Sequence, residues 1–250
     1  MHSFLKLHRI GLWRQGMIKF NNKNKINDYI EKYKINDFFT VDMTKFMELH
    51  LFNKDEHIYR ANDKIEYFYF FVEGKAKVYT LLANGKSLLI MFCNPLRIVG
   101  DVEVLYSDIA TCNLQALKEC LCIGISLENI RKYAMEDSVF LKHMCKSLGE
   151  KIAHSSLSSS INLLYPLENR LASYILAITP GDDTLAPGSE VEQMVTEKLT
   201  EIAELLGTSY RHLNRVINKF CEDGLIKKEN HKIVVLDRDS LSKLAGDLYQ

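Results

Sequence analysis

The sequence predicts an α+β fold in which an N-terminal β-barrel precedes a long helix and a C-terminal helix-turn-helix unit with a β-hairpin. Three observations support this prediction: closely spaced turn residues between positions 51 and 126, helical spacing of apolar residues after Asp137, and the pattern of residues 199–236. The chain has 250 residues, which exceeds the usual size of one domain and agrees with separate units.

The composition is that of a folded, soluble protein. Hydrophobic residues make up 47% and charged residues 26% of the chain, which argues against disorder. Lys and Arg number 32, and Asp and Glu also number 32, so any affinity for nucleic acid must be local. No run of about 18 apolar residues predicts a membrane span, and residues 1–16 lack the features of a secretory signal. We therefore expect a cytoplasmic protein that does not bind membranes.

Residues 51–136 are expected to form the barrel, after an arm and helical lead-in over residues 1–50. The turn signals in the barrel are Gly74, Asn84-Gly85, Asn94-Pro95 and Gly100. Their intervals of about 5 to 11 residues favour short strands. Asn84-Gly85 predicts a tight hairpin between strands at residues 75–82 and 87–92, because both turn residues tolerate positive φ. The aromatic run at residues 67–72 predicts a further half-buried strand.

Residues 137–164 are expected to form one long helix, which Pro166 limits. Apolar or small side chains recur there at alternating steps of four and three, as on one face of a helix. The face consists of Leu141, Cys145, Leu148, Ile152, Ser155 and Ser159. Spacing alone leaves two interpretations open: the face packs on the chain's own barrel, or it pairs with the same face of a second copy.

Residues 165–250 are expected to form a separate C-terminal unit. A helix is predicted over residues 166–178. Residues 179–189 contain two prolines and two glycines and predict a loop. Two further helices are predicted after this loop, within residues 199–223.

The stretch at residues 199–223 has the pattern of a helix-turn-helix. A short amphipathic helix ends before Gly207, which supplies the turn that a second, steeply crossing helix needs. Ser209 is a suitable N-cap for the second helix, because its hydroxyl can accept a hydrogen bond from a free backbone amide. Apolar side chains at i, i+3, i+4 and i+7 of this helix are expected to point inward. They are Leu213, Val216, Ile217 and Phe220.

The opposite face of the second helix carries side chains suited to reading base edges. They are Arg211, Asn214, Arg215 and Asn218. Arginine can bridge the two acceptors of guanine, and asparagine can match the donor and acceptor of adenine. Residues 209–219 contain three basic residues and no acid, whereas the preceding segment is acidic. Basic charge is therefore focused on this helix. Strands at residues 225–228 and 232–236 then predict a wing whose lysines contact phosphates.

These motifs resemble the Crp/Fnr superfamily of bacterial regulators. IAELLGTSYRHLNRVINKFCEDGLIKKENHKIVVLDRDSL is similar to the family's helix-turn-helix and wing throughout its length. YFFVEGKAKVYTLLANGKSLLI followed by GDVEVL resembles its cyclic-nucleotide-binding-type sensor barrel, a double-stranded β-helix of jelly-roll, cupin-like form. ECLCIGIS and the long helix complete that domain. The overall pattern, including SYRHL, is especially similar to the YeiL-like members.

The resemblance implies a sequence-specific transcription regulator and not an enzyme. It implies a homodimer that pairs its long helices at the two-fold axis and presents two reading helices to a roughly palindromic site on double-stranded DNA. Tyr210, Arg211 and Arg215 match the family's base-contacting positions, with Ser209 at the helix start. Tyr210 departs from a purely polar contact. RNA polymerase is the protein partner that the family implies.

The barrel is implied to sense a small molecule in a pocket that takes in Gly100, Asp101, Glu103 and Thr111. Cyclic-AMP receptors have a Gly-Glu pair and an Arg-Ser pair in this pocket, where the present chain has Gly100-Asp101 and Ala110-Thr111. Without that guanidinium nothing obvious neutralises a cyclic phosphate, so cyclic AMP is not expected to bind. No cofactor is predicted, and the effector is left unnamed.

Two other hypotheses stay open at this stage. The six cysteines are scattered without a CxxC pair, and none precedes Cys93, which argues against disulfides and against an iron-sulfur cluster of the Fnr type. Cys120 and Cys122 share one strand face, with Cys112 near, so a thiol- or metal-responsive regulator is an alternative. The other alternative is a ligand-binding or protein-interaction module that binds no DNA. No catalytic or metal-binding residue is predicted.

Overall fold

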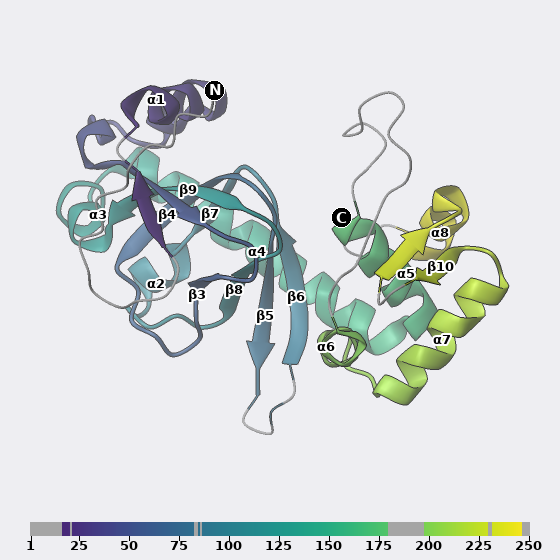
Figure 1. Cartoon of the computed structure of the whole chain (residues 1–250). Coiled ribbons are helices and arrows are strands. Elements are labelled where there is room, and N and C mark those ends of the chain that lie inside the picture. The colour runs from purple at the N-terminus through teal and green to yellow at the C-terminus, as the bar shows by residue number, and fades with distance from the viewer. Residues whose placement is uncertain are drawn as a thin grey trace, which may run out of the picture.

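The computed structural model describes residues 17–20, 22–82, 85, 87–179, 198–229 and 232–246. A two-sheet barrel lies at one end, a long helix leads away from it, and a small helical unit with a two-stranded hairpin lies at the other end (Figure 1). The predicted α+β fold class is confirmed. Of the predicted loop at residues 179–189 only Thr179 is described, and the N-terminal segment at residues 1–16 also lies outside the described residues.

The barrel consists of a five-stranded and a four-stranded sheet. The strands of the first are, in spatial order, β1 (Ile18–Phe20), β2 (Glu48–Phe52), β9 (Cys120–Ser126), β4 (Tyr67–Glu73) and β7 (Arg97–Val99). The strands of the second are β3 (His57–Tyr59), β8 (Asn113–Ala116), β5 (Ala76–Leu81) and β6 (Ser87–Cys93). All pairings within the two sheets are antiparallel.

The strands agree closely with the turn signals in the sequence. The aromatic run forms β4, and the two strands of the predicted hairpin form β5 and β6. Gly85 has φ of +79° and donates its backbone N–H to the carbonyl of Leu82 over 2.9 Å, whereas its turn partner Asn84 is outside the described residues. The barrel begins earlier than residue 51, because β2 starts at Glu48 and pairs with β1.

Helices cover one face of the first sheet. They are α1 (Lys23–Tyr33), α3 (Leu127–Tyr133) and the short 3-10 turns Ile35–Phe38 and Thr44–Phe46. Phe68 and Phe70 of β4 are fully buried, and their rings contact Phe38, Phe39 and Phe140 at centroid distances of 5.1 to 6.1 Å. This aromatic cluster fixes the start of the long helix on the barrel.

The long helix α4 spans Ser138–Leu164, as the spacing predicted. Asp137 caps its start by accepting from the backbone N–H of Val139 over 2.9 Å, and the helix ends before Pro166. Leu141 packs against the barrel core, so for this residue the intramolecular interpretation is confirmed. Leu148 is partly buried, and the other members of the predicted face are exposed: Cys145, Ile152, Ser155 and Ser159.

A second apolar core holds the C-terminal unit together, and the barrel contributes to it. This unit comprises α5 (Leu167–Ile178), α6 (Leu199–Leu205), α7 (Tyr210–Glu222), β10 (Ile226–Glu229), β11 (Lys232–Val235) and α8 (Arg238–Ala245). Leu89 and Phe92 of β6 are buried in this second core, where Phe92 contacts the ring of Tyr174 at 5.8 Å. The β5–β6 hairpin therefore packs directly against the helix-turn-helix.

Candidate nucleic-acid interface

The helix-turn-helix is built from α6, a tight turn and α7. Gly207 adopts φ of +62° in the turn, and the backbone N–H of Thr208 donates to the carbonyl of Ala203 over 2.9 Å. Arg170 of α5 donates to the carbonyl of Leu206 over 2.5 Å, which satisfies an acceptor at the end of α6. Ser209 accepts from the backbone N–H of His212 over 3.2 Å and caps α7 as predicted.

The inner face of α7 is the one that the spacing predicted. Leu213, Val216, Ile217 and Phe220 are each at most 2% exposed and belong to the second core. This continuous apolar stripe fixes the rotation of the helix about its axis, because turning it would place these side chains in water. The rotation in turn decides which polar side chains face outward.

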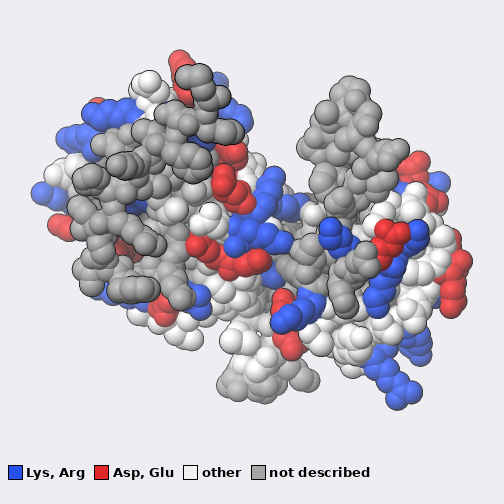
Figure 2. Space-filling model, viewed as in Figure 1, with Lys and Arg blue, Asp and Glu red and all other residues white. Residues whose placement is uncertain are grey.

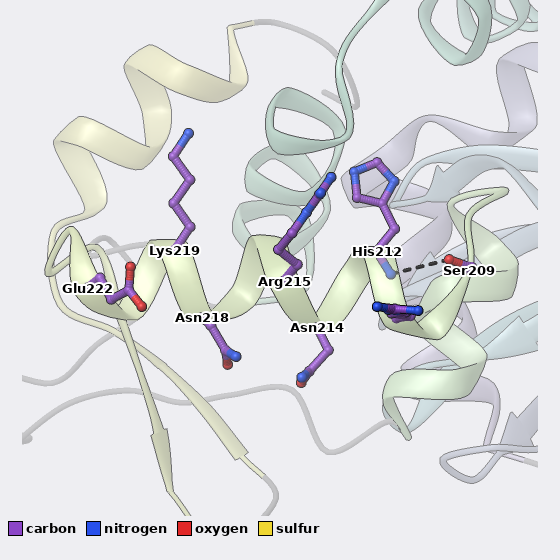
Figure 3. A pocket seen from close by; sticks show the side chains of 8 residues that line it. Ser209, His212, Asn214, Arg215, Asn218, Lys219 and Glu222 are labelled. Carbon is purple, nitrogen blue, oxygen red and sulfur yellow. Dashed lines mark hydrogen bonds between the residues drawn. The ribbon is translucent and has the colours of Figure 1, made fainter.

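The outer face of α7 forms a shallow, open concave surface, and the space that it lines has a volume of about 790 Å³. Its lining includes Ser209, Arg211, Asn214, Arg215 and Asn218 from the predicted set. Figure 3 shows Asn214 and Asn218 along one edge of the helix and His212, Arg215 and Lys219 along the other. The two rows place amide groups beside imidazole, guanidinium and ammonium groups over about two turns of helix. This is the donor and acceptor chemistry that base edges and phosphates require.

The lining of this surface differs from the predicted set of DNA-contacting residues in four residues. Tyr210 is half exposed but lies outside the lining of the concave surface. His212, Lys219 and Glu222 belong to the lining but were not among the predicted contact residues. His212 could have been found from its helical spacing to Arg215 and Lys219, because positions three and seven apart share a face. Its ring Nδ1 lies 3.3 Å from the hydroxyl of Thr208.

The wing adds exposed lysines beside α7. β10 and β11 pair antiparallel as predicted, and the turn residues Asn230 and His231 lie outside the described residues. Lys227 forms an ion pair with Glu229 at 2.5 Å, and this hydrogen bond raises the pKa of the Lys227 amine. Lys228 and Lys232 are exposed. Blue side chains project from the lower right of the molecule in Figure 2, where Figure 1 places α7.

The four predicted effector-pocket residues lie at the start of α2 (Asp101–Leu105) and in the segment before β8. Gly100 has φ of +95°, and a Cβ there would lie 2.7 Å from the hydroxyl of Tyr59. Asp101 and Glu103 are buried. Glu103 accepts from the backbone N–H and the hydroxyl of Thr111 over 3.2 and 3.3 Å. Both carboxylates are therefore bonded within the protein.

Comparison with known proteins decides the family. The cyclic nucleotide-binding domain family matches residues 49–137, and the Crp-like helix-turn-helix domain family matches residues 169–244. Regulatory protein YeiL of Escherichia coli is 32% identical over 212 residues, which cover 85% of this chain and 92% of YeiL. This chain belongs to the Crp/Fnr family. It is a Crp/Fnr-type transcriptional regulator with a helix-turn-helix DNA-binding domain.

Other members of the Crp/Fnr family are more distant in sequence. The CRP-like cAMP-activated global transcriptional regulator of Mycobacterium tuberculosis is 18% identical over 81% of this chain and 90% of its own length. A Crp/Fnr-family regulator from Eubacterium rectale superimposes with a TM-score of 0.69 at 16% identity, over 84% of this chain and 99% of that structure. A CRP-family regulator from Thermus thermophilus gives 0.63 at 21% identity, with 80% and 98% coverage. These two structures share the fold.

Family membership answers two of the questions that the sequence raised. Crp/Fnr proteins are transcription regulators, so the prediction that this chain is not an enzyme is confirmed. The predicted resemblance, including its YeiL-like character, is confirmed as well. No described helix is long and apolar enough to span a bilayer.

Three of the six cysteines of this Crp/Fnr regulator are buried: Cys93, Cys120 and Cys122. Burial raises the pKa of the Cys93 thiol to about 12 and that of Cys120 to about 11, and it raises the pKa of Cys122 as well. Thiolates are the reactive form, so these groups are poor targets for oxidation at neutral pH. No cluster of three or more potential metal-ligating side chains lies within the part of the chain that the structure describes.

Proposed function

We propose that this Crp/Fnr regulator binds a roughly palindromic site on double-stranded DNA as a homodimer and thereby controls transcription. The observation that carries the proposal is the outer face of α7, where Arg211, Arg215, Asn214 and Asn218 line one open surface. Contact with RNA polymerase at the promoter follows from the same role.

The base-reading side chains are Arg211 and Arg215, with Asn214 and Asn218 beside them. Both arginines are exposed, and within the described chain neither forms an ion pair. A free guanidinium can give two parallel hydrogen bonds to guanine, and an amide can do the same for adenine. Ser209, at the N-terminus of α7, and Lys228 on the wing are placed to contact phosphates. Tyr210, which lies at the edge of this set of side chains, is also assigned a contact with DNA.

A homodimer is supported by the surface of α4. Ile152 is 71% exposed, and Leu163 and Leu164 are 83% and 78% exposed, although large aliphatic side chains gain about 1.5 to 3 kcal/mol each from burial. The predicted face of Cys145, Leu148, Ile152, Ser155 and Ser159 adds small residues that allow close approach of two helices. Pairing through α4 would set two α7 helices about one turn of DNA apart.

The effector of the sensor barrel is not cyclic AMP in this proposal. Ala110 is buried where cyclic-AMP receptors place an arginine, so no guanidinium is present for the cyclic phosphate. The carboxylates of Asp101 and Glu103 at the same place are buried and already accept hydrogen bonds from Ser147 and Thr111, so neither supplies a donor for a phosphate.

Selection of bound sequences from a random DNA pool tests the proposal. The purified chain is used in reducing buffer without added ligand, and we expect enrichment of a palindrome. At the selected site, Arg211→Ala or Arg215→Ala is expected to weaken binding by about 1 to 3 kcal/mol and to relax preference at single base pairs. Lys228→Ala is the matched control, because loss of a phosphate contact weakens all sequences alike.

Two results would contradict the proposal. One is a folded protein that enriches no sequence and binds no DNA in the pool. The other is unchanged site affinity in both arginine variants, which would remove α7 from the interface.

A further inference from the structure

A cavity of about 290 Å³ lies between the edge strand β7 and α4, at a place that the helix-turn-helix does not use. Its polar lining is Arg97 from β7 and His143, Lys146, Ser147 and Glu150 from α4. The aromatic ring of Phe38 forms part of the wall and stacks on the imidazole of His143 at a centroid distance of 4.2 Å. The walls therefore belong to the sensor barrel on one side and to the long helix on the other.

Arg97 is the feature that needs an explanation. Its side chain is partly buried, and its one hydrogen bond within the described chain runs from Nη1 to the sulfur of Met91 over 3.5 Å. A thioether is a weak acceptor, and a guanidinium carries five N–H donors in a planar fork. Cations that are taken out of water are normally paired with an anion, because the loss of hydration is costly. The described residues supply no carboxylate within ion-pair distance of Arg97.

The neighbouring groups add positive charge to the cavity. Lys146 contacts Glu150 at 4.0 Å, but both side chains are more than half exposed, so this pair is weak and readily opened. His143 can donate from its ring nitrogen. Ser147 is already engaged, because its hydroxyl donates to Asp101 over 2.6 Å. The lining holds Arg97 and Lys146 against the single acid Glu150, which leaves a net positive charge.

We infer that this cavity binds a small anion with at least two negative charges, carried by phosphate or carboxylate groups. Arg97 holds it through two parallel hydrogen bonds, and Lys146 and His143 close the other side. The site lies outside the predicted pocket around Gly100 and Asp101. A bound anion joins the barrel to α4 directly, so it would favour one position of the long helix. Its use as an effector site rests on the proposed function, whereas anion binding does not.

Isothermal titration of the full chain without DNA tests the inference, at constant ionic strength in a chloride buffer. Inorganic phosphate and citrate are the two probes, and they separate phosphate from carboxylate recognition. We expect saturable binding of at least one probe. Arg97→Gln should weaken that binding at least about tenfold, and Lys146→Gln should weaken it as well. Lys142→Gln is the matched control on α4, because Lys142 is exposed and does not line the cavity.

The site is supported if Lys142→Gln binds the anion with wild-type affinity while Arg97→Gln and Lys146→Gln bind it more weakly. Absence of saturable heat with both probes, or equal affinity in all three variants, overturns it. Thermal unfolding of each variant confirms that Arg97→Gln is folded, and Lys146→Gln provides the test if it is not. The DNA selection is a separate experiment. A failure of the titration therefore counts against the anion site, and a failure of the selection counts against the proposed DNA binding.

Discussion

Lys151 of α4 forms an ion pair with Asp101, whose carboxylate is fully buried at the start of α2. The same amine donates to the carbonyl of Ile98 over 3.1 Å, and Ser147, one turn earlier on α4, donates to the second oxygen of Asp101 over 2.6 Å. One buried carboxylate thus holds two successive turns of the long helix against the barrel.

Removing Lys151 is expected to leave this carboxylate charged and poorly compensated. Lys151→Met should lower the free energy of unfolding by about 3 to 5 kcal/mol, because an unpaired buried charge is much more costly than a missing pair. The double variant Asp101→Asn/Lys151→Met should recover part of the loss. Denaturant unfolding of both single variants and the double variant gives the coupling energy. Strictly additive losses would show that the pair does not act as a unit.

Ile152→Glu is expected to shift the chain from dimer to monomer. The substitution places a carboxylate at the centre of the predicted α4 face, where two copies would bring like charges together. Sedimentation velocity measures the change. Leu157→Glu is the matched control, because Leu157 is 53% exposed on α4 but lies outside the predicted face. A dimer that withstands Ile152→Glu and dissociates with Leu157→Glu would place the interface elsewhere on the helix.

Truncating a buried side chain on the inner face of α7 is expected to destabilise the C-terminal unit and not to remove a contact with DNA. Leu213→Ala or Phe220→Ala removes a side chain that is at most 1% exposed and should cost about 2 to 5 kcal/mol of stability. Asn218→Ala, on the exposed outer face, should stay within about 0.5 kcal/mol of wild type. Thermal unfolding ranks the three variants. A stable Leu213→Ala variant would contradict the assigned rotation of α7.

The barrel is expected to lose stability in mild acid. His50 is fully buried between Tyr69, at 2.9 Å, and Glu48, at 3.1 Å. Burial has the largest effect and lowers the pKa of the His50 imidazole. The hydrogen bond to Glu48 raises this pKa and the charge of nearby Lys19 lowers it, and the net shift is downward. The unfolded chain takes up a proton below about pH 6.5 while the folded chain resists, so stability present above that pH is lost as the pH falls.

Unfolding curves between pH 7.5 and about 5 measure this dependence. His50→Gln should reduce the slope without abolishing it, because burial also lowers the pKa of His57. An unchanged slope in His50→Gln would assign the pH dependence to other groups.

The sequence correctly predicted the helices whose apolar residues recur with helical spacing. The stripe of Leu213, Val216, Ile217 and Phe220 fixed both the existence and the orientation of α7, and all four are buried. The length of α4 followed from the same periodicity and from Pro166. These predictions succeed because an amphipathic helix records its buried face in the sequence.

Contacts between distant segments could not be predicted in this way. Lys151 and Asp101 are 50 residues apart, and nothing near either residue marks the other as its partner. β1 was missed because three residues are too few to show alternation, and its pairing with β2 depends on register across the intervening helix. Leu141 belongs to the predicted α4 face yet packs on the barrel, since spacing shows which residues share a face but not what covers it.

The position of Leu89 and Phe92 has a consequence for dissecting the protein. Both side chains come from the barrel, yet they close the apolar interior around Tyr174. A fragment that starts at residue 165 would carry this interior with one wall missing and would expose it to water. A chimaera that joins the DNA-binding unit to a foreign sensor therefore has to transplant β5 and β6 along with the helices.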